Sequence, residues 1–228
     1  MNNLKGCTFM NKMNGSYVRA VSDTFTFLTR NREGKEIESN LAVLVEWPDS
    51  RRTPFPVYSL ANPTHFQASN PNGRSVFDPY VSVKPLCKQD LKIVTLMDNE
   101  SGFHISQQVR DLSDNEFNDY SWGLCLGGVL IGYCTIGYAD DVPETIESYP
   151  AYVDDCYLLS DVYVCPSYRN LGYGLKMIKE VIKNRWDSEE KLPVFLECFD
   201  DGVQSFYRKA GFSRIENETD LSCMVLEP

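Results

Sequence analysis

DVYVCPSYRNLGYGLKM, residues 161–177, is the stretch that decides the fold of this chain. Its first residues are typical of a strand, Pro166 ends that strand, and glycines at 172 and 174 lead into a helical pattern. A helix start leaves about four backbone N–H groups unpaired at the positive end of the helix dipole, and glycine lets an anion come close. The stretch therefore predicts a pyrophosphate site, although the glycines alone also fit a purely structural turn.

The spacing of the turn residues shows which of the known phosphate-binding motifs the turn matches. The chain contains no GxxxxGK[ST] P-loop, and the turn lacks the third glycine of the GxGxxG dinucleotide motif. Arg169, Gly172 and Gly174 instead match an R/QxxGxG/A signature. Through this signature the chain resembles the GNAT superfamily of acyl-CoA-dependent N-acyltransferases, over about residues 88–228.

Two further segments support the resemblance. LLSDVYV, residues 158–164, precedes the signature, and SFYRKAGF, residues 205–212, is similar to the closing FYxxxGF segment of the family. The resemblance implies an α+β fold with a mixed, mostly antiparallel sheet flanked by helices, whose central strands splay apart to admit acetyl-CoA. We therefore predict an acetyltransferase domain at 88–228, after an N-terminal extension at 1–87 that contains a β-hairpin and a proline-rich loop region.

Hydrophobic periodicity predicts the individual elements. In the extension, residues 16–29 and 37–47 predict the hairpin, and six prolines from 54 to 85 leave room only for short regular structure. In the domain, the patterns predict strands at 91–97, 157–164 and 193–199, helices at 105–112, 170–186 and 200–210, a hairpin over 120–138 and a last hairpin after Gly211.

The resemblance also implies which residues bind the donor. Backbone groups of Val162, Tyr163 and Val164 would hold the pantetheine arm and the acetyl carbonyl, and the turn would cradle the pyrophosphate through Arg169, Asn170, Leu171, Gly172, Tyr173 and Gly174. Asp200 stands where many relatives have a cofactor-contacting Asn, and Val203 stands where a small residue is expected. Asp200 is thus either a cofactor contact or a simple N-cap.

Two residues are candidates for the chemistry. Tyr207 matches the tyrosine that, in many relatives, donates a proton to the departing CoA thiolate; a tyrosine hydroxyl is protonated at neutral pH, as such an acid must be. Asp161 resembles an acidic strand residue that faces the acceptor in polyamine acetyltransferases, and a purely structural hydrogen bond is the alternative. His65 and His104, the only histidines, are expected to be structural or exposed.

The charge distribution bears on the acceptor. The net charge is −10, with 10 basic and 7 acidic residues in 1–85 but 12 basic and 25 acidic residues in 86–228. This balance argues against nucleic acid and anionic membranes as partners. Acidic residues gather at Asp111, Asp114, Glu116 and Asp119 and in the loop from Asp140 to Asp155. We expect a cationic acceptor: a polyamine, an aminoglycoside-like amine, or the Lys or N-terminal amine of a peptide.

The cysteines and the hydrophobic runs of the sequence bear on metal binding and location. Eight cysteines without CxxC spacing or a nearby histidine predict free buried thiols, no metal site and a cytoplasmic location. Neither a signal peptide nor a membrane span is expected. Residues 1–87 could cover the acceptor site, form a homodimer contact or complete the core. The rival function is a non-catalytic acyl-CoA-binding or interaction module of the same fold.

Overall fold

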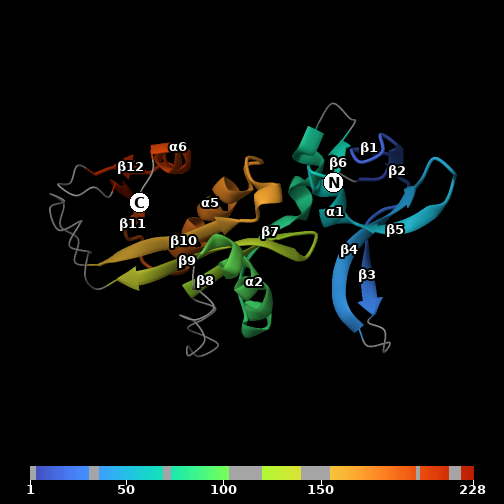
Figure 1. Ribbon diagram of the computed structural model, residues 1–228. Coiled ribbons are helices and arrows are strands. Elements are labelled where there is room, and N and C mark those ends of the chain that lie inside the picture. The colour runs from blue at the N-terminus through green and yellow to red at the C-terminus, as the bar shows by residue number, and fades with distance from the viewer. Residues whose placement is uncertain are drawn as a thin grey trace. The chain divides into compact units, whose positions relative to one another are not determined.

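The computed structural model describes residues 4–30, 36–68, 73–102, 120–139, 155–198, 201–215 and 222–228. The chain forms two compact units (Figure 1). The first unit consists of Met1–Ser82 with two later segments, Leu124–Ile131 and Cys165–Leu171. The second unit consists of Val83–Gly123, Gly132–Val164 and Gly172–Pro228.

A six-stranded sheet forms the first unit, in the order β3-β4-β2-β1-β6, with β5 paired to β4. Strands β3 and β4 pair antiparallel, which confirms the predicted hairpin. The proline-rich region contains short elements only, as expected. The elements of residues 4–85 are β1 Thr8–Asn11, β2 Tyr17–Ala20, β3 Phe25–Arg30, β4 Glu36–Glu46, β5 Arg52–Pro56, α1 Val57–Ala61, β6 Phe66–Ala68, the 3-10 helix Gly73–Tyr80 and β7 Val81–Pro85.

The first unit includes the turn between β8 (Ser121–Leu126) and β9 (Val129–Ala139). Gly127 in this turn donates its N–H to Tyr80 at 2.9 Å and accepts from the N–H of Leu41 at 3.0 Å. The N-terminal residues therefore share a packed unit with this turn. The predicted boundary between residues 87 and 88 is not tested by these contacts and stays a prediction.

A seven-stranded sheet runs through the second unit, in the order β12-β13-β11-β10-β9-β8-β7. Strands β10 and β11 pair in parallel, whereas β9 with β10 and β11 with β13 pair antiparallel, so the sheet is mixed. Its later elements are β10 Cys156–Val164, α5 Tyr173–Ser188, β11 Val194–Cys198, α6 Asp201–Ala210, β12 Ser213–Arg214 and β13 Ser222–Leu226.

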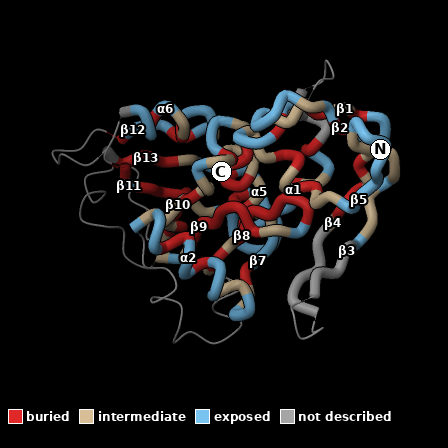
Figure 2. Tube along the Cα trace, turned by 45° about the vertical axis from the view of Figure 1, so that its right-hand side comes forward, coloured by how far each residue is buried: buried red, intermediate tan, exposed pale blue. Residues whose placement is uncertain are grey.

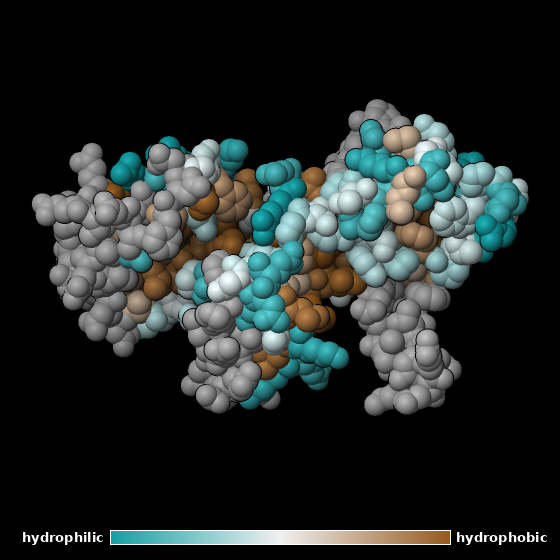
Figure 3. All heavy atoms as spheres, in the orientation of Figure 1, coloured by the Kyte–Doolittle hydropathy of each residue, from teal (hydrophilic) through white to brown (hydrophobic). Residues whose placement is uncertain are grey.

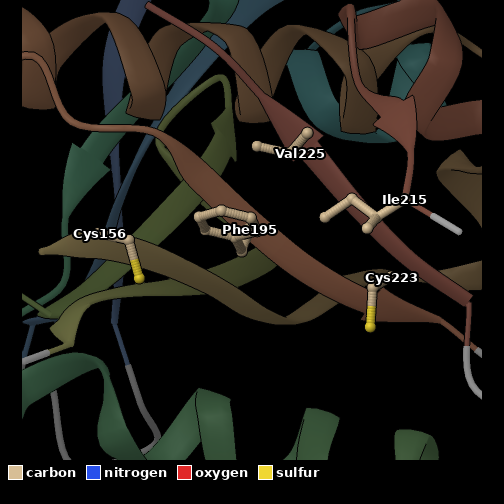
Figure 4. Packing of buried hydrophobic residues seen from close by; sticks show 5 residues of the cluster. All are labelled: Cys156, Phe195, Ile215, Cys223 and Val225. Atoms are coloured by element: carbon tan, nitrogen blue, oxygen red, sulfur yellow. The ribbon is translucent and has the colours of Figure 1, made fainter. Parts of the chain in front are cut away.

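Helix α5 packs on the sheet because its apolar residues recur at helical spacing. Met177, Ile178, Val181 and Ile182 are buried on one side of the helix. Buried residues also follow the central strands (Figure 2). A buried hydrophobic cluster joins β10, β11, β13 and the segment after β12 (Figure 4). Its members are Cys156, Phe195, Ile215, Cys223 and Val225.

The strand predicted at 91–97 is wrong, because this segment lies within α2, a helix over Leu91–Ser101. The β-branched residues Ile93, Val94 and Thr95 favour a strand locally. However, the buried residues Val94, Met97 and Asp98 follow the i, i+3, i+4 spacing of one helix face, so packing overrides local preference. The helix ends at Gly102, whose φ of 80° is the left-handed conformation of a helix C-terminus.

Candidate active site

Strand β10 contains an irregularity at the candidate residue Asp161. The register with β9 shifts between Ser160 and Tyr163, and Asp161 has a φ of 52°. Aspartate accepts this left-handed conformation more readily than most residues, and the extra residue of a bulge re-aims a side chain. The hydroxyl of the fully buried Thr135 on β9 donates to Oδ2 of Asp161 at 3.2 Å and also contacts Ser160.

The central strands diverge after two residue pairs. Strand β10 pairs with β11 at Tyr157 with Val194 and at Leu158 with Phe195, whereas its pairing with β9 continues to Val164. The predicted donor-binding residues 162–164 therefore lie beyond the stretch that β10 shares with β11. Figure 3 shows hydrophobic residues gathered in this part of the second unit, over β10. A thioester arm could add to β10 here as a further strand does.

Helix α5 follows β10 in the chain after the intervening segment 165–172. Gly172 is its N-cap, with a φ of 83°, and no side-chain hydrogen bond caps the helix. A Cβ on Gly172 would meet no atom of the described residues within 4 Å. A Cβ on Gly174 would lie 3.4 Å from Val164 and 3.3 Å from Phe206, so the small residue lets β10, α5 and α6 approach one another. Such a helix start suits an anion.

The remaining turn residues belong to the first unit. Arg169 is exposed and follows the 3-10 helix Pro166–Tyr168. Asn170 has a φ of 60°. Within this unit the hydroxyl of Tyr168 donates to the backbone oxygen of Tyr58 at 3.2 Å. Donor binding by Arg169, Asn170 and Leu171 stays a prediction.

Tyr207 lies on α6 and is buried, with 8% of its surface exposed. Its ring packs edge-on against Phe206 and Phe212, at centroid distances of 5.1 and 5.8 Å. Burial, and to a smaller degree the electrostatic effect of Cys198 and Cys134, raises the pKa of the Tyr207 hydroxyl above its ordinary value. The hydroxyl is therefore protonated at neutral pH, as its proposed role as an acid requires.

Sequence reasoning missed a set of polar residues on α2. Tyr133 on β9 donates its hydroxyl to Oδ1 of Asp98 at 2.8 Å, and Ser101 lies 3.3 Å from the same hydroxyl. Tyr163 donates its hydroxyl to Glu100 at 2.5 Å. Because residues 91–97 were predicted as a strand, nothing pointed to Asp98; the signal available in the sequence was Gly102 as a helix stop.

The candidate residues lie on two opposite faces of the sheet. Strand alternation puts Tyr133 and Thr135 of β9 on the face that α2 covers, and Asp161 bonds to Thr135 there. Cys134 points to the other face, which carries α5 and α6, and there it contributes to the raised pKa of Tyr207. The side chains of Asp161 and Tyr207 thus lie on opposite faces of the sheet; their roles in the chemistry stay predictions.

Several expectations fall outside the described residues. These are the helix at 105–112, His104, Asp200, and the acidic residues Asp111, Asp114, Glu116, Asp119 and 140–154. None of the eight cysteines, all of which lie within the described residues, forms a disulfide; six are buried, and Cys87 and Cys165 are partly buried. Within the described part of the chain, no group of three His, Cys, Asp or Glu side chains is arranged to hold a metal ion. In the same part, no helix is long and apolar enough to cross a membrane.

Comparison with solved structures identifies proteins of the same fold. NAA60 of Arabidopsis thaliana, in complex with acetyl-CoA, is 15% identical with a TM-score of 0.52, covering 64% of this chain and 97% of its own. The same protein with a bisubstrate analogue gives 17% identity, a TM-score of 0.51 and the same coverage. A GNAT-family acetyltransferase of Streptococcus agalactiae gives 12% identity and a TM-score of 0.51, covering 65% of this chain and 95% of its own.

A match to a family model decides the class. The model of the acetyltransferase (GNAT) family matches residues 92–212, about half of the chain. No curated protein matches the chain. The fold and this match define an acyltransferase, and the chain belongs to the acetyltransferase (GNAT) family. The resemblance and fold class predicted from the sequence are confirmed.

Proposed function

We propose that this protein is an N-acetyltransferase that moves the acetyl group of acetyl-CoA directly to a primary amine. One observation supports the proposal: Asp161, on β10 beyond its last pair with β11, bonds to Thr135 on the α2 face of the sheet, whereas Tyr207 of α6 lies on the opposite face. A carboxylate on one side and a protonated hydroxyl on the other are the two groups that amine acylation needs. The donor would approach from the face of α5 and α6, and the amine from the face of α2.

The residues of the second unit fit acetyl-CoA as the donor. Beyond the two pairs shared with β11, residues 162–164 of β10 would align the acyl-bearing arm. The start of α5 at Gly172, Tyr173 and Gly174 would hold the pyrophosphate through backbone N–H groups. Acetyl-CoA would supply a thioester carbonyl and a thiolate leaving group. The acetyl-CoA complex of the structurally similar NAA60 supports this choice of donor.

The two candidate residues account for the protons. Asp161 would take one proton from the incoming ammonium, which leaves a neutral amine whose nitrogen forms a bond to the acetyl carbon. Tyr207 would give its proton to the sulfur as the carbon–sulfur bond breaks. The nitrogen then loses a second proton, which restores Tyr207. The products are the acetylated amine and CoA thiol, with one proton released from Asp161.

A cationic acceptor fits the charges on the α2 face. Asp98, Glu100 and Asp161 all have carboxylates on that face, in a part of the chain with 25 acidic and 12 basic residues. Opposite charge raises the local concentration of a cation and orients it. We propose a polyamine, an aminoglycoside-like amine or a lysine or N-terminal amine of a peptide as the acceptor.

The experiment is a measurement of thiol release from acetyl-CoA across a panel of amines, with Tyr207→Phe as the matched control. The panel includes spermidine, kanamycin, a lysine-rich peptide and a neutral amide without a free amine. We expect release with at least one cationic amine and none with the amide. A thermal shift with CoA, but no turnover with any amine, would instead favour a non-catalytic CoA-binding module.

A further inference from the structure

Two hydrogen-bonded pairs of polar side chains, Tyr133 with Asp98 and Thr135 with Asp161, lie on the α2 face of the two central strands. Asp98 is 5% exposed and accepts the hydroxyl proton of Tyr133 at 2.8 Å. Tyr133 and Thr135 are two residues apart on one face of β9, and the bulge that contains Asp161 lies opposite them on β10. The carboxylate of Glu100 accepts a hydrogen bond from the hydroxyl of Tyr163 at 2.5 Å.

Asp161 has hydrogen-bond donors in Thr135 and Ser160, and Asp98 is a like charge on the same face of the sheet. Thr135 donates to Oδ2 of Asp161, and Tyr133 donates to Asp98 rather than to Asp161. Two carboxylates in a partly buried site disfavour a second negative charge, so one of them holds a proton more readily than in water. For Asp161, burial and the charge of Asp98 both favour the protonated form.

We propose that Asp98 and Thr135 are positioning residues for Asp161: Asp98, held by Tyr133, places a like charge on the same face of the sheet, and the hydroxyl of Thr135 fixes the Asp161 carboxylate in its bulge. The inference rests on the proposed function, in which Asp161 receives the proton of the incoming ammonium. The α2 carboxylate thereby makes Asp161 a stronger base, and Thr135 limits that effect.

The electrostatics of the site agree with this arrangement. Burial, and then the charge of Asp98, raises the pKa of Asp161, whereas hydrogen bonds from Thr135 and Ser160 lower it. The titratable groups of the described residues around Asp161 are Asp98 and Glu100 from α2, Tyr133 from β9 and Tyr163 from β10. Of these, Asp98 is the carboxylate that acts on Asp161.

The test is the acidic limb of the pH profile of kcat/KM, measured with a cationic amine that the wild-type protein acetylates. Protonated Asp161 cannot accept a proton, so activity falls as the pH drops through its pKa. Asp98→Asn removes the charge but keeps an oxygen for Tyr133, and we expect the limb to move about half a pH unit or more lower. Thr135→Val removes the donor, and we expect the limb to move higher.

Matched controls separate this effect from local damage. Thr135→Ser keeps a hydroxyl and should restore the wild-type limb, and Ser101→Ala removes an uncharged neighbour of Tyr133 and should leave the limb in place. The inference would be overturned if the acidic limb of the kcat/KM profile moved in the same direction in Asp98→Asn and Thr135→Val, or if it moved in neither.

A second measurement does not depend on turnover. The carbon-13 resonance of the Asp161 carboxyl, assigned from its absence in Asp161→Asn, titrates with the pKa of this group. Opposite shifts of this titration in the two variants support the inference even if no amine of the panel is acetylated, an outcome that would count against the proposed function alone. Unchanged titrations would overturn the inference with the function intact.

Discussion

The two faces of the sheet at β10 differ in kind. The α2 face carries carboxylates and hydroxyls bonded to one another, among them Asp98, Tyr133, Thr135 and Asp161. The α5 and α6 face is apolar: Tyr207 lies among Phe206, Phe212 and thiols, and burial raises the pKa of Cys134 to about 12. In the proposed function the polar face would receive the charged amine, and the apolar face would keep the Tyr207 hydroxyl protonated for the leaving group.

The largest expected effect is on the apolar face. Tyr207→Phe removes the acid but keeps the ring packing against Phe206 and Phe212. We expect kcat to fall about 100-fold or more, because positioned acids contribute about 10²–10⁴-fold, while affinity for acetyl-CoA stays the same. Steady-state kinetics and calorimetry with CoA would measure the two quantities; an equal loss in both would contradict the acid role.

The corresponding change on the polar face is Asp161→Asn. The amide keeps an acceptor for Thr135 but cannot take a proton, so we expect kcat/KM for a cationic amine to fall about 10- to 100-fold. Acetyl-CoA affinity should not change, since in the proposed arrangement the donor would approach from the other face. Kinetics with each substrate varied in turn would check this, and loss of donor affinity alone would reverse the assignment of the faces.

A substitution of Gly172 at the start of α5 should weaken the binding of acetyl-CoA without affecting the amine. Gly172 has a φ of 83°, which costs a residue with a Cβ about 1–2 kcal/mol. We expect Gly172→Ala to raise the KM for acetyl-CoA about tenfold as the helix start relaxes, without a change in the KM for the amine. Gly102→Ala, at a left-handed position outside the donor site, is the matched control for strain.

The smallest expected effect is that of salt. Exposed charge attraction is screened over about 8 Å at physiological ionic strength. We expect the KM of a cationic amine to rise about two- to fivefold as salt increases, and the KM of acetyl-CoA to change less. Initial rates at several salt concentrations would measure this, and a salt-insensitive KM for the amine would argue against charge-based selection of the acceptor.

Most of the predicted elements near the site are present in the structure. The hairpin of β8 and β9, strand β10, helix α5 and the final antiparallel strands could be predicted because their signals are local: alternation, helical spacing and glycine turns. The segment that became α2 could not, because its β-branched residues favour a strand while its buried positions follow a helix. That choice depends on what packs against it.

The sequence by itself determined the family, because Arg169, Gly172, Gly174 and the FYRKAGF segment are short-range patterns. Only the tertiary structure decided which residues surround Asp161. Its bulge, its bond to Thr135 and the charge of Asp98 bring together residues up to 63 positions apart in the chain. Backbone turns are encoded by neighbours in sequence, whereas the proton affinity of a carboxylate is set by whatever folding brings beside it.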